Sequence, residues 1–407
     1  MPNKNHFIRD SVHGNVQITK FEMDVIDQPQ YQRLRRIKQL GLIYLIYPGA
    51  NHTRFEHSIG TMHLASKLAN HLNLSKYDIE LVRISAILHD IGHGPFSHVS
   101  EGVLSVPHEK LTEYVIKNTS IKDKLIEKFD LKEIIDIING RGALGPIVSG
   151  ELDVDRMDYL IRDSHYTGVS YGVIDIERII SNLKLEKYLV LDIKGVQAAE
   201  ATLVSRYFMY PSVYQHHTTR IVNAMFRRIL RMSIEKNIIN EKEIYKHDDS
   251  DLTSIFRNNE GFIKETITRI DNRELFKRIH TTKLNKFKNP ETFYNISKKE
   301  IRKVEEEISE DLEIDKNYVI VNIAEYPEFD EMKTQVSSDG KLYHLNEISS
   351  IVEALSHARF NIPDISVYVP KEEKHKFKKF KLENYMELPE LSDKEFDTMH
   401  FDQIKLL

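Results

Sequence analysis

Two successive apolar patterns of helical spacing occupy the first quarter of the chain, and the second ends abruptly. Apolar residues recur every three or four positions through 55–72 and again through 78–90, after which Gly92, Gly94 and Pro95 follow. Residues at this spacing share one face of a helix, which must pack against other elements to be buried. Further patterns of this kind lie at 112–118, 131–138, 153–166 and 176–183. The sequence therefore predicts a mainly α fold.

The pattern changes in the second half of the chain. Residues 188–195 alternate apolar and polar side chains and end in Lys-Gly, which is typical of a strand and a turn. A long helical stretch follows from about 196 to 236 and is interrupted at Pro211. After about residue 240, Lys, Glu and Asn become more frequent, and short β-like runs occur at 318–326 and 365–370.

These changes predict two regions. Residues 1–240 are expected to form a helical core, and residues 241–407 a smaller α+β region. The charged run at 371–381 is interpreted as a solvated face, because runs of Lys and Glu usually lie in water.

The composition limits the chemistry that the chain can perform. None of the 407 residues is cysteine, so disulfides are excluded and any metal must be bound by nitrogen and oxygen atoms. The N-terminal segment lacks the apolar core of a signal peptide, and the longest apolar stretch, 41–47, is far shorter than the roughly 20 residues of a membrane span. We therefore expect a cytoplasmic protein without a membrane segment. The net charge of −5 disfavours general nucleic-acid binding, and an anionic substrate would need a local cluster of basic side chains.

Histidines are concentrated in the part of the chain that holds the first two helical patterns. Eight of the 19 histidines lie between residues 52 and 108, a window of about a seventh of the chain. Histidine is the commonest metal ligand and an acid or base near neutral pH. Chemistry is therefore expected in this window, although His63 and His71 are interpreted as structural or surface residues.

Four side chains form a candidate metal-ligand set. His57 lies on the first helical pattern, His89 and Asp90 end the second, and Asp155 begins a later one. Asp155 shares a helical face with Tyr159 and Asp163, at spacings of four residues. Two imidazoles and two carboxylates suit Mg, Mn, Fe, Zn or Ni, with coordination positions left open for water and substrate.

These motifs resemble the H…HD…D signature of the HD-domain phosphohydrolases, and within them the deoxynucleoside triphosphate (dNTP) triphosphohydrolases. The segments "RFEHSIG" (54–60), "ILHDIGHGPFSH" (87–98) and "LDVDRMDYLIRDSHYTG" (152–168) carry the resemblance. It covers roughly residues 7–230 and is loose over the C-terminal third. Three further segments extend it, at 26–41, 47–58 and 205–217.

The resemblance implies an HD-domain helical catalytic core and a hydrolytic activity. In that family a water attacks the α-phosphorus of a dNTP and releases a deoxynucleoside and intact triphosphate. The resemblance also implies a homo-oligomer, either dimer or tetramer. The divalent metal would be held by His57, His89, Asp90 and Asp155.

Residue by residue, the resemblance also implies a substrate site. His93 and His108 would assist attack and protonation of the leaving group. The residues near the phosphates would be Arg54, His98, Arg156, Tyr159 and Arg206. The residues around the sugar, which would favour deoxyribose over ribose, are Gln39, Leu40, Asp163 and Tyr214.

The sequence departs from the family pattern at two places. The family's aspartate partner of the catalytic histidine falls at Glu101, which keeps the carboxylate and adds a methylene. In the regulated relatives a GTP or dNTP activator is read by residues that match Asp27, Gln32 and Arg35, but the family's lysine falls at about His6. The matched residues imply an activating nucleotide and a regulatory N-terminal segment, and the change at His6 leaves open both the activator's identity and the need for one.

Two other functions fit the same residues. A phosphomonoesterase or phosphodiesterase would use the same metal, and His93, His98 and His108 could ligate a second one. A nucleotide sensor or nucleic-acid-binding protein would use the basic segments 283–290 and 371–381 against a phosphate backbone. The complete H…HD…D set and the net negative charge disfavour this third function.

Overall fold

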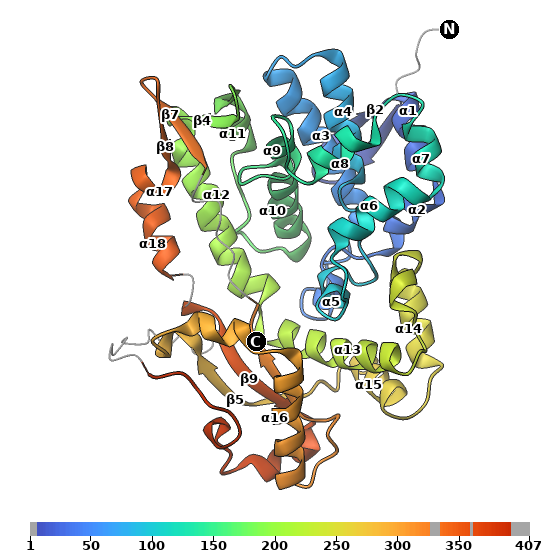
Figure 1. Cartoon of the computed structure of the whole chain (residues 1–407), viewed down its shortest axis with the longest axis vertical. Coiled ribbons are helices and arrows are strands. Elements are labelled where there is room, and N and C mark those ends of the chain that lie inside the picture. The colour runs from blue at the N-terminus through green and yellow to red at the C-terminus, as the bar shows by residue number, and fades with distance from the viewer. Residues whose placement is uncertain (1–5, 326–333, 359–360, 392–407) are drawn as a thin grey trace. The chain divides into compact units, whose positions relative to one another are not determined.

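The computed structural model of the chain describes residues 6–325, 334–358 and 361–391 (Figure 1). The chain divides into two compact units, one of residues 1–274 with 329–356 and the other of residues 275–328 with 357–407. The first unit is mainly helical and the second combines helices with a small sheet, so the predicted mainly α fold is confirmed. Among the residues described, no helix has both the length and the apolar character of a membrane span.

Most helices of the first unit pack around one apolar core. Its core includes Ile59, Met62, Ala65, Ile84 and Leu88, which recur at the predicted helical spacing and are buried. The helices are α1 (Lys20–Ile26), α2 (Pro29–Gln32), α3 (Arg54–His71), α4 (Lys76–Leu88), α5 (His98–Glu101), α6 (His108–Asn118), α7 (Ser120–Leu125), α8 (Leu131–Ile138), α9 (Gly145–Val148), α10 (Val154–Thr167), α11 (Ile176–Asn182), α12 (Val196–Met209), α13 (His217–Glu235), α14 (Asp249–Arg257) and α15 (Gly261–Asp271).

Capping residues fix where the site helices begin. Helix α3 follows Thr53, whose backbone N–H donates to the Glu56 carboxylate at 2.6 Å. Helix α10 follows Asp153, whose carboxylate accepts from the backbone N–H of Arg156 at 2.7 Å. These caps set Asp155 in the first turn of α10 and His57 in the first turns of α3.

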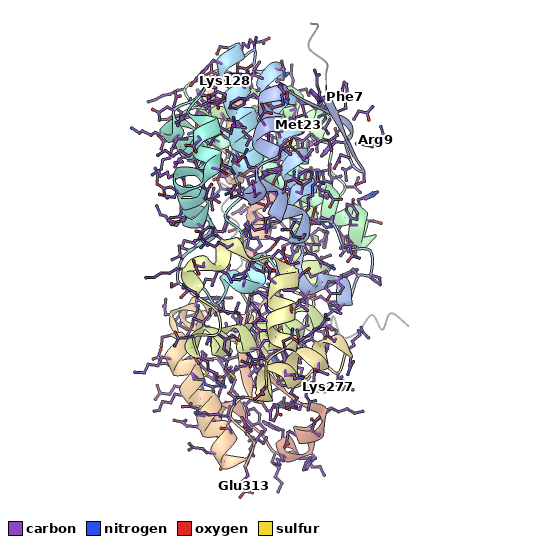
Figure 2. All side chains as sticks on the ribbon, turned by 90° about the vertical axis from the view of Figure 1, so that its right-hand side faces the viewer. Phe7, Arg9, Met23, Lys128, Lys277 and Glu313 are labelled. Atoms are coloured by element: carbon purple, nitrogen blue, oxygen red, sulfur yellow. The ribbon has the colours of Figure 1, made fainter. Side chains whose placement is uncertain are left out.

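One antiparallel sheet and one mixed sheet complete the first unit. Strands β1 (His6–Asp10) and β2 (Gly14–Ile18) form a hairpin, on whose outer surface Phe7 and Arg9 project (Figure 2). The other sheet has the order β3-β4-β7-β8, in which β4 and β7 run parallel. Its strands are β3 (Leu183–Leu185), β4 (Leu189–Asp192), β7 (Gln335–Ser338) and β8 (Lys341–His344), and α17 (Leu345–Ile348) and α18 (Ser350–Ala358) follow.

The predicted boundary near residue 240 falls inside the first unit. Helices α14 and α15, which follow it, belong to the first unit, in which Phe256 of α14 packs edge-on against Phe226 of α13 with ring centroids 5.4 Å apart. Strand β7 returns to the same unit by pairing with β4. The composition shift at 240 does not coincide with the change of unit, which follows residue 274.

The predicted long helix around Pro211 is broken as expected. Helix α12 ends at Met209, a π-helical turn spans Tyr210–Tyr214, and α13 begins at His217. Proline cannot donate the hydrogen bond that a continuous helix needs, so the widened turn forms there. This turn carries Tyr214 toward α10, where its hydroxyl meets Asp163.

The second unit has a three-stranded antiparallel sheet of order β5-β9-β6. Its strands are β5 (Lys277–Lys283), β6 (Ile320–Ile323) and β9 (Asp364–Val369), and its long helix is α16 (Lys298–Asp311). The predicted β-run 318–326 thus contains β6, although residue 326 lies outside the described part, and the run 365–370 overlaps all of β9 except Asp364. The charged run after β9 forms a short 3-10 helix (Lys371–Phe377) in which Phe377 is buried and Lys371 is exposed.

Candidate active site

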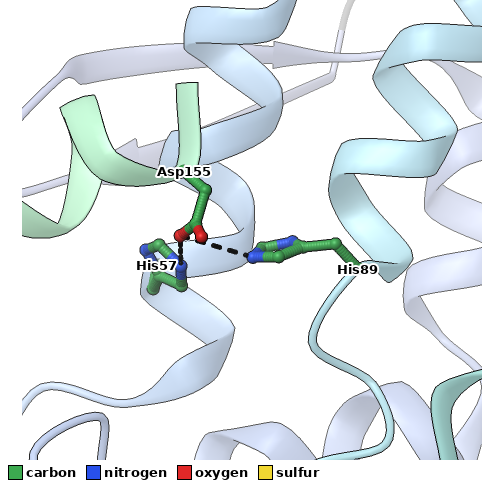
Figure 3. Close-up of side chains that lie close together, drawn as sticks. All are labelled: His57, His89 and Asp155. Carbon is green, nitrogen blue, oxygen red and sulfur yellow. Dashed lines mark ion pairs between the residues drawn. The ribbon is translucent and has the colours of Figure 1, made fainter. Parts of the chain in front are cut away.

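Three helix ends bring two imidazoles and one carboxylate together. The Asp155 carboxylate lies 2.9 Å from Nε2 of His57 and 3.6 Å from Nε2 of His89 (Figure 3). His57 comes from α3, His89 caps the C-terminus of α4, and Asp155 lies in α10. Residues separated by about one hundred positions therefore converge, as the proposed ligand set requires.

Asp90 lies against the two imidazoles of this group. Its carboxylate is 3.4 Å from Nε2 of His89 and 3.6 Å from Nε2 of His57, and it also pairs with the guanidinium of Arg54. The buried Nε2 of His89 has no hydrogen-bond partner among the described residues. A buried polar atom without a partner is costly, and a divalent cation among these oxygen and nitrogen atoms would satisfy it. His57, His89 and Asp155 therefore fit a metal, and Asp90 lies beside them.

Hydrogen bonds and neighbouring charges shift the pKa values of the proposed metal ligands. Burial disfavours the imidazolium of His57, but hydrogen bonds to Asp155 and Asp158 outweigh it and raise the pKa of His57 to about 10. Burial also opposes ionisation of Asp90, but the charges of Arg54 and His89 hold its pKa well below the ordinary value. The carboxylates are thus ionised at neutral pH and available as ligands.

A second group of acid–base side chains adjoins Asp90. The rings of His93 and His108 stack with centroids 3.8 Å apart, and Nε2 of His93 lies 3.4 Å from Asp90. Glu101 accepts hydrogen bonds from Nδ1 of His98 at 2.9 Å and from Nδ1 of His108 at 2.7 Å. The longer side chain of Glu101 reaches both imidazoles, so the departure from aspartate keeps a carboxylate partner for His108.

The environments of the stacked histidines push their pKa values in opposite directions. Burial and the nearby charge of Arg54 hold the pKa of His93 well below the ordinary value. Burial also opposes the charge of His108, but its hydrogen bond to Glu101 prevails and raises the pKa of His108. Two titratable groups with opposed shifts suit opposite roles in proton transfer, His93 as acceptor and His108 as donor.

A strained loop carries these residues. Phe96 and Ser97 both have positive φ, 57° and 55°, which side chains other than glycine rarely adopt. The backbone N–H of Phe96 donates to the carboxylate of Asp249 at 2.6 Å, and the buried Arg33 donates to the carbonyl of His93 at 2.8 Å. These bonds compensate the strain and hold the loop between His93 and His98.

The predicted phosphate-binding residues are distributed around this centre. Arg54 is buried and donates to Ser97 Oγ at 2.8 Å in addition to its pair with Asp90. Arg156 donates to Asp153 and to the Gly150 carbonyl. Burial raises the pKa of Tyr159 and Tyr214, the nearby charge of Arg206 partly opposes this rise, and the two rings lie 6.4 Å apart. His98 is exposed beside Glu101.

The predicted sugar-binding residues contact a further histidine, His52, which was not assigned to the site from the sequence. Asp163 accepts from Tyr214 Oη at 2.7 Å and from Nε2 of His52 at 2.9 Å. The backbone N–H of Gln39 donates to the carbonyl of His52 at 3.0 Å, and Leu40 is partly buried. His52 therefore links Gln39 to Asp163. Its position five residues before His57 was the available signal, but spacing alone does not show this contact.

The predicted activator-binding residues lie on the segment after α1. Gln32 accepts from Arg35 Nε at 2.8 Å, and the Arg35 guanidinium lies 3.5 Å over the Phe55 ring. Asp27, at the end of α1, is exposed, and His6 begins β1. Binding of an activator by these residues stays a prediction.

Family models match the segments that build this site. The HD domain model matches residues 54–163, which contain all four proposed ligands, and the model of an HD associated region matches residues 174–397. The chain belongs to the HD-domain family. The predicted resemblance is therefore confirmed at the level of the family.

Relatives of this HD-domain protein include curated sequences and solved structures. An uncharacterized protein of Methanocaldococcus jannaschii is 39% identical over 372 residues, covering 90% of this chain and 79% of the relative. A protein named deoxynucleoside triphosphate triphosphohydrolase SAMHD1 homolog, from Dictyostelium discoideum, is 31% identical, covering 66% of this chain and 59% of its own length. The crystal structure of a phosphohydrolase from Bacteroides thetaiotaomicron has a TM-score of 0.75 at 27% identity, covering 90% of this chain and all of that one. Together with the cluster of His57, His89 and Asp155, these findings support a metal-dependent hydrolase of the HD-domain family.

Proposed function

We propose that this HD-domain protein is a dNTP triphosphohydrolase. The observation that carries the proposal is the adjacency of two groups that meet at Asp90, the metal set around His57 and the proton-transfer pair of His93 and His108. The dNTP triphosphohydrolase name of the Dictyostelium relative supports the choice of substrate class. Because this chain covers only 59% of that relative, the substrate is inferred from the site as well as from the likeness.

The chain's own groups account for each part of the proposed reaction. A bound divalent cation would polarise a phosphoryl oxygen and increase the acidity of a water. His93, whose pKa is lowered, accepts the proton as that water attacks the α-phosphorus. The bond from the α-phosphorus to the 5′ oxygen breaks, and His108, whose pKa is raised, donates a proton to that oxygen. The products are a deoxynucleoside and triphosphate.

Basic side chains supply the positive field that the substrate needs. A triphosphate brings about four negative charges to a chain of net charge −5, so binding depends on local cations. Arg54, Arg156 and Arg206 are proposed to bind the phosphates, because guanidinium groups bind phosphate oxygens in a fixed geometry. Asp163 and Tyr214 are proposed to face the sugar, and the bulk of Leu40 is proposed to exclude a 2′-hydroxyl.

A panel of substrates tests the proposal. The purified protein is incubated with each dNTP, each NTP and a nitrophenyl phosphate ester in the presence of Mn²⁺ or Mg²⁺, and the products are separated by anion exchange. Deoxynucleoside and triphosphate formed only from dNTPs is the expected result. Release of orthophosphate or pyrophosphate alone would contradict a triphosphohydrolase.

A phosphomonoesterase or phosphodiesterase remains a second candidate because of one observation. Asp90, His93 and His108 also lie close enough together to share a cation, which would make a site of two metals. Elemental analysis separates the two functions, since two tightly bound metals per chain favour the esterase. The nucleic-acid-binding function, the GTP or dNTP activator and the assembly into a dimer or tetramer stay predictions.

Replacing Glu101 with glutamine is expected to move the pH dependence of activity. The Glu101 carboxylate raises the pKa of His108, so its loss lets His108 release its proton at lower pH. The alkaline limb of the kcat/KM profile should therefore shift to lower pH, measured from pH 6 to 10. Glu109→Gln is the comparison variant and should shift the limb less, because Glu109 lies 3.6 Å from His108, is half exposed and raises the pKa of His108 less than Glu101 does. An unchanged limb in Glu101→Gln would contradict the role of His108 as proton donor.

Replacing His52 with alanine is expected to weaken the preference for deoxyribose. Without His52, one oxygen of the buried Asp163 loses its donor and the carboxylate is free to reorient. The ratio of kcat/KM for dNTP over NTP should fall by about tenfold, equivalent to about 1.4 kcal/mol. The exposed His165, which lies in α10 with Asp163, provides the control variant His165→Ala. Equal ratios in wild type and His52→Ala would show that His52 does not position Asp163 for the sugar.

A further inference from the structure

A buried carboxylate that the proposed reaction does not use lies directly behind the metal set. Asp158 of α10 is fully buried and accepts from Nδ1 of His57 at 2.8 Å. Nε2 of His57, on the other side of the ring, faces Asp155 at 2.9 Å. Since a carboxylate only accepts, His57 donates through Nδ1 to Asp158, and a metal would replace the proton that Nε2 shares with Asp155.

The helix opposite is shaped to admit this carboxylate. Gly60 lies one turn after His57 in α3, and a Cβ at this position would be 1.9 Å from Oδ1 of Asp158 and 2.3 Å from Nη2 of Arg162. Glycine in a helix interior costs about 1 kcal/mol relative to alanine, so its presence here needs a reason. The close approach of Asp158 and Arg162 to α3 supplies that reason.

Asp158 is in turn held from two directions. Within α10, Arg162 donates to both of its oxygens at 2.8 and 2.9 Å. From the N-terminal hairpin, Nε2 of His13 contacts Oδ1 of Asp158 at 2.6 Å, and the side chain of His13 is only 9% exposed. His13 and Asp158 are 145 positions apart, so this contact ties the hairpin to the helix that carries Asp155.

The turn of the hairpin is built to present His13. The carboxylate of Asp10 accepts from the backbone N–H groups of Val12 and His13 at 2.9 and 2.8 Å, which closes the turn between β1 and β2. The same carboxylate binds Arg162 at 2.8 and 3.2 Å. The hairpin therefore contacts the Asp158–Arg162 pair through two side chains, Asp10 and His13.

We propose that His13 is a positioning residue for the metal centre, acting through Asp158 to fix the ring of His57. The inference rests on the proposed function only through the metal that His57 would bind. Hydrogen bonds behind a metal-binding histidine fix its tautomer and orientation, and their loss typically weakens metal binding by about 10- to 100-fold. The N-terminal hairpin, which lies outside the segment matched by the HD domain model, is thereby part of the metal site.

Metal titration of the metal-free protein tests this inference without any substrate. Isothermal titration calorimetry with Mn²⁺, and with Zn²⁺ in a second series, is expected to give a Kd about 10-fold higher for His13→Ala than for wild type. His13→Gln keeps a donor and should recover most of the affinity. Asp158→Asn, which removes the acceptor charge, should weaken binding more than His13→Ala does.

Controls separate positioning from a merely structural role. Asn15→Ala alters the exposed face of the same hairpin and should leave the Kd unchanged. A structural role alone would lower the melting temperature of the metal-free protein and leave the Kd as in wild type, which would overturn the inference. If Asp158→Asn does not fold, the His13 variants still decide the question. A wild-type protein that binds neither Mn²⁺ nor Zn²⁺ would instead overturn the metal centre, and this inference with it.

Discussion

Replacing His89 with alanine is expected to abolish turnover while the protein stays folded. The ring of His89 contacts Asp90 and Asp155, and its Nε2 has no hydrogen-bond partner among the described residues, so its loss removes a metal ligand. A metal in such a site contributes several kcal/mol of charge stabilisation to the transition state, and each 1.36 kcal/mol is tenfold in rate. The kcat should therefore fall by at least about 1000-fold, measured with a dNTP and saturating Mn²⁺.

The controls for this prediction come from the same helices. His71→Ala removes an exposed histidine at the end of α3 and should leave kcat unchanged. Asp90→Asn should match His89→Ala in its loss of activity. It is preferred to Asp90→Ala, because removing one partner of the buried pair with Arg54 costs about 3–5 kcal/mol of stability. Wild-type activity in His89→Ala, with the fold verified by circular dichroism, would exclude the proposed metal set.

Replacing His108 with glutamine is expected to lower kcat by about 10²- to 10⁴-fold without loss of the metal. His108 stacks on His93 and is held by Glu101, and glutamine keeps a hydrogen-bonding group there but cannot act as an acid. Single-turnover kinetics with a dNTP measure the rate, and the calorimetric titration with Mn²⁺ measures the Kd.

The same pair of measurements interprets the outcome. A variant that loses rate and keeps the wild-type Kd confirms a role in proton transfer. A variant that binds Mn²⁺ much more weakly would show instead that His108 is a ligand, as expected for a two-metal esterase. Tyr114→Phe, on the exposed side of the same helix, should behave as wild type in both measurements.

Local signals in the sequence predicted the site helices closely. The patterns 55–72 and 78–90 correspond to α3 (Arg54–His71) and α4 (Lys76–Leu88), and the small differences at their starts follow from the caps. Ser75 accepts from the backbone N–H of Asp78 and so begins α4 earlier than the apolar pattern indicates. Apolar spacing reports which face is buried, whereas caps decide where a helix begins.

The motifs in the sequence predicted the four proposed ligands, but they did not predict the side chains that contact those ligands from the side away from the metal. The sequence does not single out His13, Asp10 or Arg162, because their partners are 145 to 152 positions away. His52 was indistinguishable from His63 and His71 for the same reason. Contacts at such separations depend on how helices pack, which a single sequence does not contain.

The division of the chain into two units could not be predicted either, because it depends on contacts between segments far apart in the sequence. The composition after residue 240 suggests a new region, yet Phe256 packs on Phe226 and Val336 of β7 pairs with Leu191 of β4. The alternating pattern at 188–195 predicts the strand that becomes β4, but it does not show that its partner comes from residues 335–338.

Hydrolysis of a dNTP in water enriched in ¹⁸O tests the central claim most directly. The products are analysed by mass spectrometry and by the isotope shift in ³¹P nuclear magnetic resonance. Attack of water on the α-phosphorus predicts one ¹⁸O on a terminal phosphorus of intact triphosphate, with an unlabelled deoxynucleoside. Label in orthophosphate or pyrophosphate, or no triphosphate at all with Mn²⁺ present, would contradict the proposed function.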